Sequence, residues 1–157
     1  MDLGKSRKAL SCFRQGLQVA NNTPYGYILK AQAEWALGNN EEAWKLSNEA
    51  VSADPLDPRT YHFRAFMQSS ISAGVEDRKS QETEVNDYLH ILERIPQYQR
   101  VSIIHNNLGY VYYEMKEFQL AKKHFDMSIQ LCPHHVQTYY NKALCLAEMN
   151  DMDTALL

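Results

Sequence analysis

Cys132, His134 and His135 lie close together in the sequence, and their sulfur and imidazole nitrogen atoms are ligands that zinc accepts. A structural zinc site needs four ligands, however, and no second pair of Cys or His residues lies at a suitable spacing. The chain has no HExxH pattern, no glycine-rich phosphate loop, and no recognisable grouping of nucleophile, base and orienting residue. We therefore expect no catalytic residues, no metal site and no cofactor.

The remaining histidines are spread among helical patterns, where packing or surface roles are the ordinary ones. They are His62, His90, His105 and His124. Two small groups of basic residues are also present, and each is expected to be a solvated helix face. They are Lys122 and Lys123 with Arg100, and Lys5, Arg7, Lys8 and Arg14. Because the net charge is −3, the chain has no large positive field to attract nucleic acid, and RNA binding is only a third functional hypothesis.

The composition indicates one well-packed domain: 157 residues, of which 45% are hydrophobic and 11% aromatic. No apolar run approaches the roughly 20 residues that span a bilayer, and the first residues lack the apolar segment of a secretory signal. The three cysteines are an odd number without close pairing, which favours a reducing compartment over a disulfide framework. We expect a cytoplasmic protein with no membrane partner.

The elements that carry these residues follow a repeat of 34 residues. Pairs at this separation include Ala9 and Ala43, Pro24 and Pro58, Tyr27 and Tyr61, Ala31 and Ala65, Gly109 and Ala143, and Ala121 and Ala155. Two stretches also share a second spacing of seven and then five residues, namely Ala43, Ala50, Pro55 and Ala121, Ser128, Pro133. Where two helices cross, a side chain larger than Ala or Gly would hold the backbones apart. Proline then ends the second helix, since it cannot continue the hydrogen-bond ladder.

One stretch carries a family pattern. It reads Leu108-Gly109-x-x-Tyr112, then Ala121-x-x-x-Phe125, then Pro133. The chain thus resembles a tetratricopeptide-repeat (TPR) protein, in which helix-turn-helix units stack. The resemblance implies an all-α fold, a right-handed α-solenoid of about eight helices, that offers a surface for partners and has no built-in chemistry.

Helical periodicity predicts the bounds of the helices and units. The expected helices are 5–20, 24–37, 41–53, 59–73, 80–95, 102–115, 118–131 and 136–149. As one array over 1–157, they give the second helix of an incomplete unit (1–23), a complete unit (24–57), a divergent unit with an insertion (58–101), a complete unit (102–135) and a truncated unit (136–157). Gly38 is expected to supply a left-handed turn, and Asp57 with Pro58 to open a helix.

The divergent unit is ten residues longer than the others, because its successor begins 44 rather than 34 residues later. We expect the extra residues in a longer turn at 74–79 and a longer connection at 97–101. Glu84 falls where the other units have Ala, so helix crossing there should differ. The acidic stretch 76–87 could be a solvated helix start or a site for a basic partner.

In TPR proteins the first helices of the units line a concave groove that commonly receives an extended peptide or a helix of a partner protein. Carried onto this chain by register, the groove candidates are Tyr25, Ile28, Leu29, Gln32, Arg59, His62, Phe63, Phe66, Ile103, Asn106, Asn107, Tyr110, Gln137, Tyr140 and Asn141. Aromatic rings supply contact area at small entropy cost, and amides can pair with a peptide backbone through donor and acceptor atoms. The other interpretation is that several of the aromatics pack between helices. The asparagines are more telling, since amides are not buried without partners.

One TPR subclass, the chaperone-tail binders, grips a C-terminal carboxylate with Lys, Arg and Asn side chains. Only the central Asn has a match here, Asn107. The other clamp positions hold Ile28 and Gln32, or His62 and Phe66, and then Gln137 and Asn141. Without the cations the charge-assisted bonds are lost, so we expect no such clamp.

Two functions follow from the resemblance. The first is an adaptor or scaffold in a protein complex, which binds a segment of another protein in its groove. The second is a structural module, because the first and last units are incomplete and could stack with copies of the chain. A fragment of a longer array would explain the incomplete ends equally well.

Overall fold

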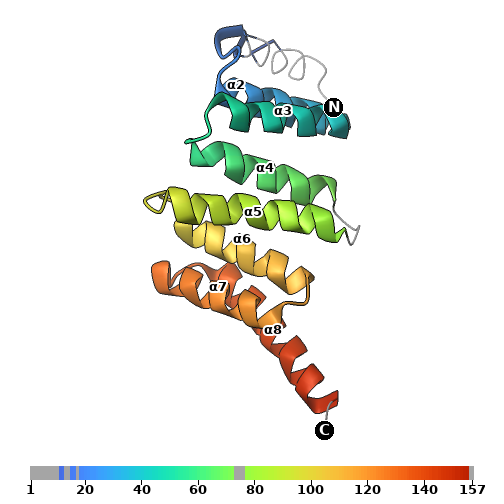
Figure 1. Cartoon of the computed structure of the whole chain (residues 1–157), viewed down its shortest axis with the longest axis vertical. Helices are drawn as coiled ribbons and strands as arrows, with labels where there is room; N and C mark the ends of the chain where they lie inside the picture. Colours follow the sequence, from blue (N-terminus) through green and yellow to red (C-terminus); the bar gives the residue numbers. More distant parts are fainter. Residues whose placement is uncertain (1–10, 13–14, 17, 73–76, 156–157) are drawn as a thin grey trace. The chain divides into compact units, whose positions relative to one another are not determined.

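The computed structural model describes residues 11–12, 15–16, 18–72 and 77–155, with side chains up to residue 150 (Figure 1). Every regular element in these ranges is a helix, which confirms the all-α fold class. Seven helices are bounded, close to the eight expected, and most of the predicted helix 5–20 lies outside the described residues. The chain divides into two compact units, Met1–Ile71 and Ser72–Leu157.

Each unit is a succession of antiparallel helices joined by short turns (Figure 1). Unit 1 contains α2 (Pro24–Ala36), α3 (Asn40–Ala53) and α4 (Pro58–Ile71). Unit 2 contains α5 (Arg78–Arg94), α6 (Val101–Glu114), α7 (Phe118–Leu131) and α8 (Val136–Ala155). In unit 1, α3 packs against α2 and α4; in unit 2, α6 packs against α5 and α7, and α8 contacts both α7 and α6. Alternate helices, here α6 and α8, therefore share a face.

Capping residues fix where several helices begin. The Thr23 hydroxyl accepts a hydrogen bond of 3.0 Å from the backbone N–H of Gly26, with Pro24 as the first helical residue of α2. The Asp57 carboxylate accepts one of 2.9 Å from the N–H of Arg59, and α4 then begins at Pro58. These bonds satisfy N–H groups that have no partner within the helix. The predicted helix start at Asp57 and Pro58 is confirmed.

Three described residues have left-handed backbone conformation: Asn22 with φ of +61°, Gly38 and Lys116, of which the last two lie in equivalent turns. Gly38 has φ of +84° between α2 and α3, as its position in the sequence predicted. At the equivalent turn between α6 and α7 the residue is Lys116, with φ of +63°, where no glycine signals the conformation. Because a residue with a side chain is strained in this region, the conformation of Lys116 carries a local energetic cost.

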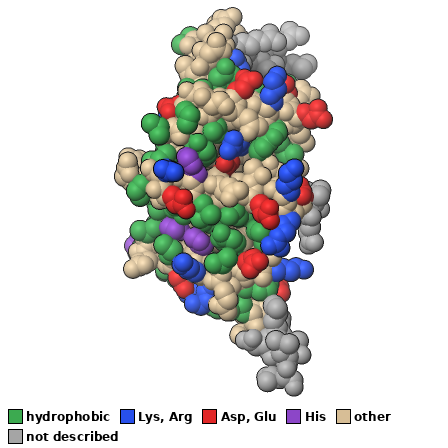
Figure 2. Space-filling model, viewed as in Figure 1, with side chains coloured by type: hydrophobic (Ala, Val, Ile, Leu, Met, Phe, Trp, Pro, Cys, Tyr) green, Lys and Arg blue, Asp and Glu red, His purple; other side chains and the backbone are tan. Residues whose placement is uncertain are grey.

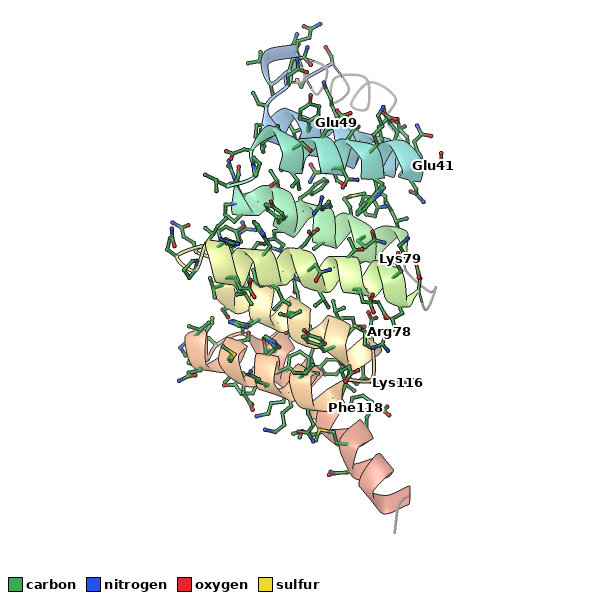
Figure 3. The ribbon with its side chains drawn as sticks, viewed as in Figure 1. Glu41, Glu49, Arg78, Lys79, Lys116 and Phe118 are labelled. Atoms are coloured by element: carbon green, nitrogen blue, oxygen red, sulfur yellow. The ribbon has the colours of Figure 1, made fainter. Side chains whose placement is uncertain are left out.

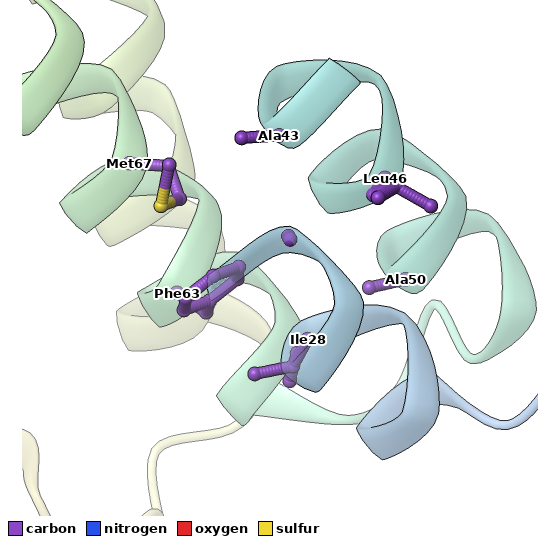
Figure 4. Close-up of a cluster of buried hydrophobic side chains, with 7 residues drawn as sticks. Ile28, Ala43, Leu46, Ala50, Phe63 and Met67 are labelled. Carbon is purple, nitrogen blue, oxygen red and sulfur yellow. The ribbon is translucent and has the colours of Figure 1, made fainter. Parts of the chain in front are cut away.

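The core of unit 1 is built around alanines at the helix crossings (Figure 4). Ala31, Ala43 and Ala50 are fully buried, so the backbones of α2 and α3 approach closely. The larger side chains that fill the space around them are Ile28, Leu46, Phe63 and Met67. Small residues at crossings thus have the role that the repeat pattern predicted.

Gly109 has the same role in unit 2. A Cβ atom placed on it would lie 2.7 Å from the Phe125 ring of α7 and 3.2 Å from the carbonyl oxygen of Ala121. Ala121 and Phe125 of α7 are fully buried at this crossing, and the fully buried Cys145 of α8 belongs to the same core cluster. The close approach of α6 and α7 therefore depends on a residue without a side chain at position 109.

The insertion lies partly within a helix. Helix α5 has 17 residues where α3 and α7 each have 14. Residues 95–100 connect α5 to α6, a longer connection than 132–135 between α7 and α8, as expected. Of the longer turn predicted at 74–79, residues 74–76 lie outside the described part, while Arg78 and Lys79 already belong to α5.

Candidate functional site

In unit 1 the predicted groove residues divide between surface and core. Exposed side chains are Tyr25, Gln32, Arg59 and Phe66, half-buried ones are Leu29 and His62, and buried ones are Ile28 and Phe63. Ile28 and Phe63 belong to the hydrophobic core cluster, so their role in this structure is packing. Arg59 forms an ion pair of 2.6 Å with Asp57, whose pKa its hydrogen bonds hold below the ordinary value.

An exposed aromatic pair in unit 1 extends beyond the predicted set. The Trp35 ring of α2 meets the Phe66 ring of α4 edge-on, with ring centroids 5.9 Å apart. Trp35 was missed because it lies near the end of α2, outside the register positions from which the groove set was chosen. Its aromatic type was the signal that could have found it.

In unit 2 the predicted residues lie on α6 and α8. Exposed ones are Ile103, Tyr110, Gln137 and Tyr140, Asn107 is half-buried, and Asn106 and Asn141 are buried. The structure thus brings the unit 2 candidates onto two helices that contact each other. We call this surface the α6/α8 face.

A chain of amide hydrogen bonds lies beneath the α6/α8 face. Gln137 donates to the side-chain oxygen of Asn141 at 3.0 Å, and Asn141 donates to that of Asn106 at 3.1 Å. Asn106 donates to Asn107 at 3.3 Å, and Asn107 donates to the Tyr88 hydroxyl on α5 at 3.4 Å. These amides satisfy one another, and each still has a further N–H or lone pair to offer.

Tyrosine rings flank the amides. The Tyr110 and Tyr113 ring centroids on α6 are 6.1 Å apart, and Tyr140 on α8 is close enough to affect the titration of both. Tyr110 is 40% exposed and Tyr140 is 59% exposed. Burial, and then the charge and hydrogen bond of Glu114, raise the pKa of Tyr110. Burial, and then the charge of Glu148, raise that of Tyr113. We call these three tyrosines with the two glutamates the tyrosine face.

Glu84 is a buried carboxyl group next to this face. Burial, and then the negative charge of Glu114, raise the pKa of Glu84 to about 8, although a hydrogen bond with Tyr88 opposes the shift. Burial also raises the pKa of Glu114. The sequence showed that Glu84 stands where Ala was expected, but it did not show that Glu114 lies close to Glu84. The carboxyl groups of α5 and α6 therefore repel each other when both are ionised.

Two histidines meet between α6 and α7. Their Nδ1 atoms are 2.9 Å apart, so one ring donates a hydrogen bond to the other, and Tyr112 stacks on His124 at a centroid distance of 5.5 Å. Burial, and then the charge of His105, lower the pKa of His124 to about 4. Burial lowers the pKa of His105 as well. At neutral pH both rings are uncharged and serve packing.

The sequence cluster at the start of α8 is not arranged for metal binding. His135 hydrogen bonds through Nδ1 to the Thr138 hydroxyl at 2.7 Å, while His134 is exposed. Among the residues that the structure describes, no three His, Cys, Asp or Glu side chains are placed to hold a metal ion together. Nor does any helix in that part of the chain have the length and apolar character needed to cross a membrane.

Basic residues do not gather into a track on the face that Figure 2 shows, where positive and negative side chains are interspersed. In the basic spot on α7, Lys122 forms an ion pair of 3.0 Å with Asp126. The other predicted spot consists of Lys5, Arg7, Lys8 and Arg14, which lie outside the described residues.

The comparisons with known proteins address the repeat pattern directly. The family model for the tetratricopeptide repeat matches residues 102–135, which include nearly all of α6 and the whole of α7. Residues 102–135 are a tetratricopeptide repeat. The predicted resemblance to TPR proteins is confirmed, with no subfamily assigned. No curated protein matches the sequence.

Solved structures show the same TPR fold over most of the chain. The crystal structure of MamA is 16% identical, with a TM-score of 0.70 over 99% of this chain and 90% of that chain. PilF of Pseudomonas aeruginosa is 18% identical, with a TM-score of 0.77 over 94% of this chain and 63% of that chain. The first TPR of Spaghetti (RPAP3), solved with the HSP90 peptide SRMEEVD, is 15% identical, with a TM-score of 0.68 over 81% of this chain and 93% of that chain. At these identities the likeness concerns the fold.

Proposed function

We propose that the protein is a non-catalytic adaptor that binds an extended or helical segment of a partner protein on the α6/α8 face. One observation carries the proposal: exposed Ile103, Tyr110 and Tyr140 lie around the buried, hydrogen-bonded pair Asn106 and Asn141. The amide pair holds α6 and α8 together, so the aromatic side chains are presented on a prearranged surface. Prearrangement reduces the entropy lost on binding.

The surface chemistry suits a peptide. Tyrosine contributes large contact area with only two side-chain torsions, and its hydroxyl group retains a hydrogen-bonding end. Gln137 is exposed and can offer its remaining N–H and lone pair to a peptide backbone. In unit 1 we propose a second contact area at Tyr25, Gln32, Arg59 and Phe66. For the array we propose an incomplete unit at 1–23, repeat units at 24–57, 58–101 and 102–135, and a truncated unit at 136–157.

The comparison with Spaghetti supports a peptide ligand but not the same one. That TPR was solved with an HSP90 peptide, so the fold can accept an extended segment. In this chain, helix α6 has no Lys or Arg, and the clamp positions on α8 hold Gln137 and Asn141. We propose a partner segment that is not recognised through its terminal carboxylate.

The proposed compartment is the cytoplasm. Cys12, Cys132 and Cys145 are all free thiols in the structure, which supports a reducing environment.

Selection from a random-peptide display library tests the function. Peptides that bind the unmodified chain are measured against Tyr110→Ala/Tyr140→Ala, which removes two aromatic rings from exposed positions of the α6/α8 face without changing its charge. Asn141 is left intact because it is buried in the amide chain. We expect at least about a tenfold loss of affinity, as for central aromatic contacts in other interfaces.

Leu120→Ala is the matched control, because Leu120 is a comparably exposed hydrophobic residue on α7. It should bind the peptides as the unmodified chain does. Equal binding by the double variant, or no enrichment of peptides at all, would contradict the proposal. A mass that rises with concentration, measured by light scattering, would favour self-assembly instead.

A further inference from the structure

The tyrosine face has an excess of negative charge. Glu114 and Glu148 are exposed, and neither forms an ion pair among the residues that the structure describes. Helix α6 contains no Lys or Arg. The single cation of α8, Lys142, is bound at 2.6 Å to Asp126 of α7 and is thus held toward that helix. The face therefore has anionic groups and no cation of its own.

The aromatic rings at the same place add a second attraction for cations. The faces of aromatic rings carry partial negative charge and attract the cationic groups of Arg and Lys. Tyr110 and Tyr113 lie with centroids 6.1 Å apart, and after burial the charge of Glu114 helps to raise the pKa of Tyr110. A planar guanidinium group can stack on a tyrosine ring while donating two hydrogen bonds to a carboxylate. The rings beside Glu114 thus offer an aromatic surface for stacking, and Glu114 offers the carboxylate that accepts the hydrogen bonds.

The buried carboxyl group of Glu84 would respond to a cation bound at Glu114. Glu84 is buried on α5, and the charge of Glu114 opposes its ionisation. A cation bound at Glu114 would offset that charge and so favour the ionised form of Glu84. Arg78 does not fill this role, since it pairs with Glu82 and Glu117 at the start of α5 and the α6–α7 turn. Figure 3 shows Arg78 at the same end of unit 2 as Lys116 and Phe118.

We propose that the tyrosine face binds an arginine side chain of the partner segment, between the rings of Tyr110, Tyr113 and Tyr140 and the carboxylates of Glu114 and Glu148. This inference rests on the proposed function and specifies the chemistry of its partner: a basic segment of another protein. Nucleic acid is disfavoured at this face, because its phosphates would meet the two glutamates.

The experiment uses peptides selected on the unmodified chain and their copies with arginine replaced by citrulline, which has nearly the same shape but no charge. We expect the selected sequences to be rich in arginine and the citrulline copies to bind about tenfold more weakly. The variant Glu114→Gln keeps the size of the side chain but removes its charge, and should reduce affinity about fivefold. The control Glu93→Gln, an exposed glutamate on α5, should leave affinity unchanged.

The outcomes separate this inference from the function on which it rests. Selected peptides without basic residues, or equal binding of the arginine and citrulline copies, would overturn the inference while leaving the adaptor function standing. A selection that yields no peptide would overturn the function itself. If Glu114→Gln has no effect while citrulline does, the cation binds elsewhere and the assignment to this face is wrong.

Discussion

Asn141 on α8 donates a hydrogen bond of 3.1 Å to Asn106 on α6, and both side chains are buried. This bond links α6 and α8 directly, without passing through α7. It also fixes the orientation of the helices that carry the exposed tyrosines.

Removing one partner of that bond should cost more than removing both. Asn141→Leu leaves the Asn106 oxygen buried without its donor, with an expected loss of about 1–3 kcal/mol in the free energy of unfolding. Asn106→Leu/Asn141→Leu should lose less than the sum of the two single variants, because the two groups couple. Urea unfolding of the four proteins measures this. Strict additivity would show that the bond contributes nothing to stability.

Gly109 should not tolerate alanine. The added methyl group would meet Phe125 at 2.7 Å, so Gly109→Ala should destabilise the fold by about 1–3 kcal/mol through overpacking. Phe125→Leu, which removes the contacting ring, should make the same glycine substitution less costly. Thermal unfolding of the single and double variants tests this, and an undiminished cost in the double variant would locate the strain elsewhere.

Substitutions at Lys116 and Gly38 should change the stability of the fold in opposite directions. Lys116→Gly should stabilise by up to about 1 kcal/mol, because φ of +63° strains a lysine. Gly38→Ala should destabilise by about 1 kcal/mol or more for the same reason. Lys116→Ala is the control, since alanine is strained too and should change little. Chemical denaturation provides the values, and destabilisation by Lys116→Gly would refute the strain.

The histidine pair should make the fold sensitive to mild acid. Because the pKa of His124 is lowered to about 4 and that of His105 also lies below the ordinary 6.5, the unfolded chain binds more protons as the pH falls. The stabilisation is fully present above pH 6.5 and is lost as the pH falls toward 4. His124→Gln should reduce the acid-induced loss in the free energy of unfolding by about 1 kcal/mol. His134→Gln, at an exposed position, should leave the pH dependence of stability unchanged. Identical stability–pH profiles for the two variants would exclude the histidine pair as the cause of the acid sensitivity.

Much of the fold follows from a few residues. The 34-residue spacing and the alanines at positions 31, 43 and 50 express a geometric requirement for close helix crossing, which is local and repeats along the chain. Gly38 and Asp57 likewise act within their own turns. Such features can be predicted because each depends on its immediate neighbours in the sequence.

The site was less predictable because its chemistry depends on pairs from different helices. Asn106 and Asn141 could be selected as amides, but their bond to each other depends on the rotation of α6 against α8. The meeting of His105 with His124 and the effect of Glu114 on Glu84 depend on crossings of the same kind. Lys116 was missed because its strained conformation is imposed by the turn and not by its residue type.

Hydrogen exchange measured by mass spectrometry, with and without a selected peptide, tests the central claim most directly. If the partner segment lies on the α6/α8 face, backbone protection should increase in residues 101–114 and 136–149, while 118–131 on α7 change little. Protection confined to α7, or to unit 1 alone, would contradict the assignment of the binding surface to α6 and α8.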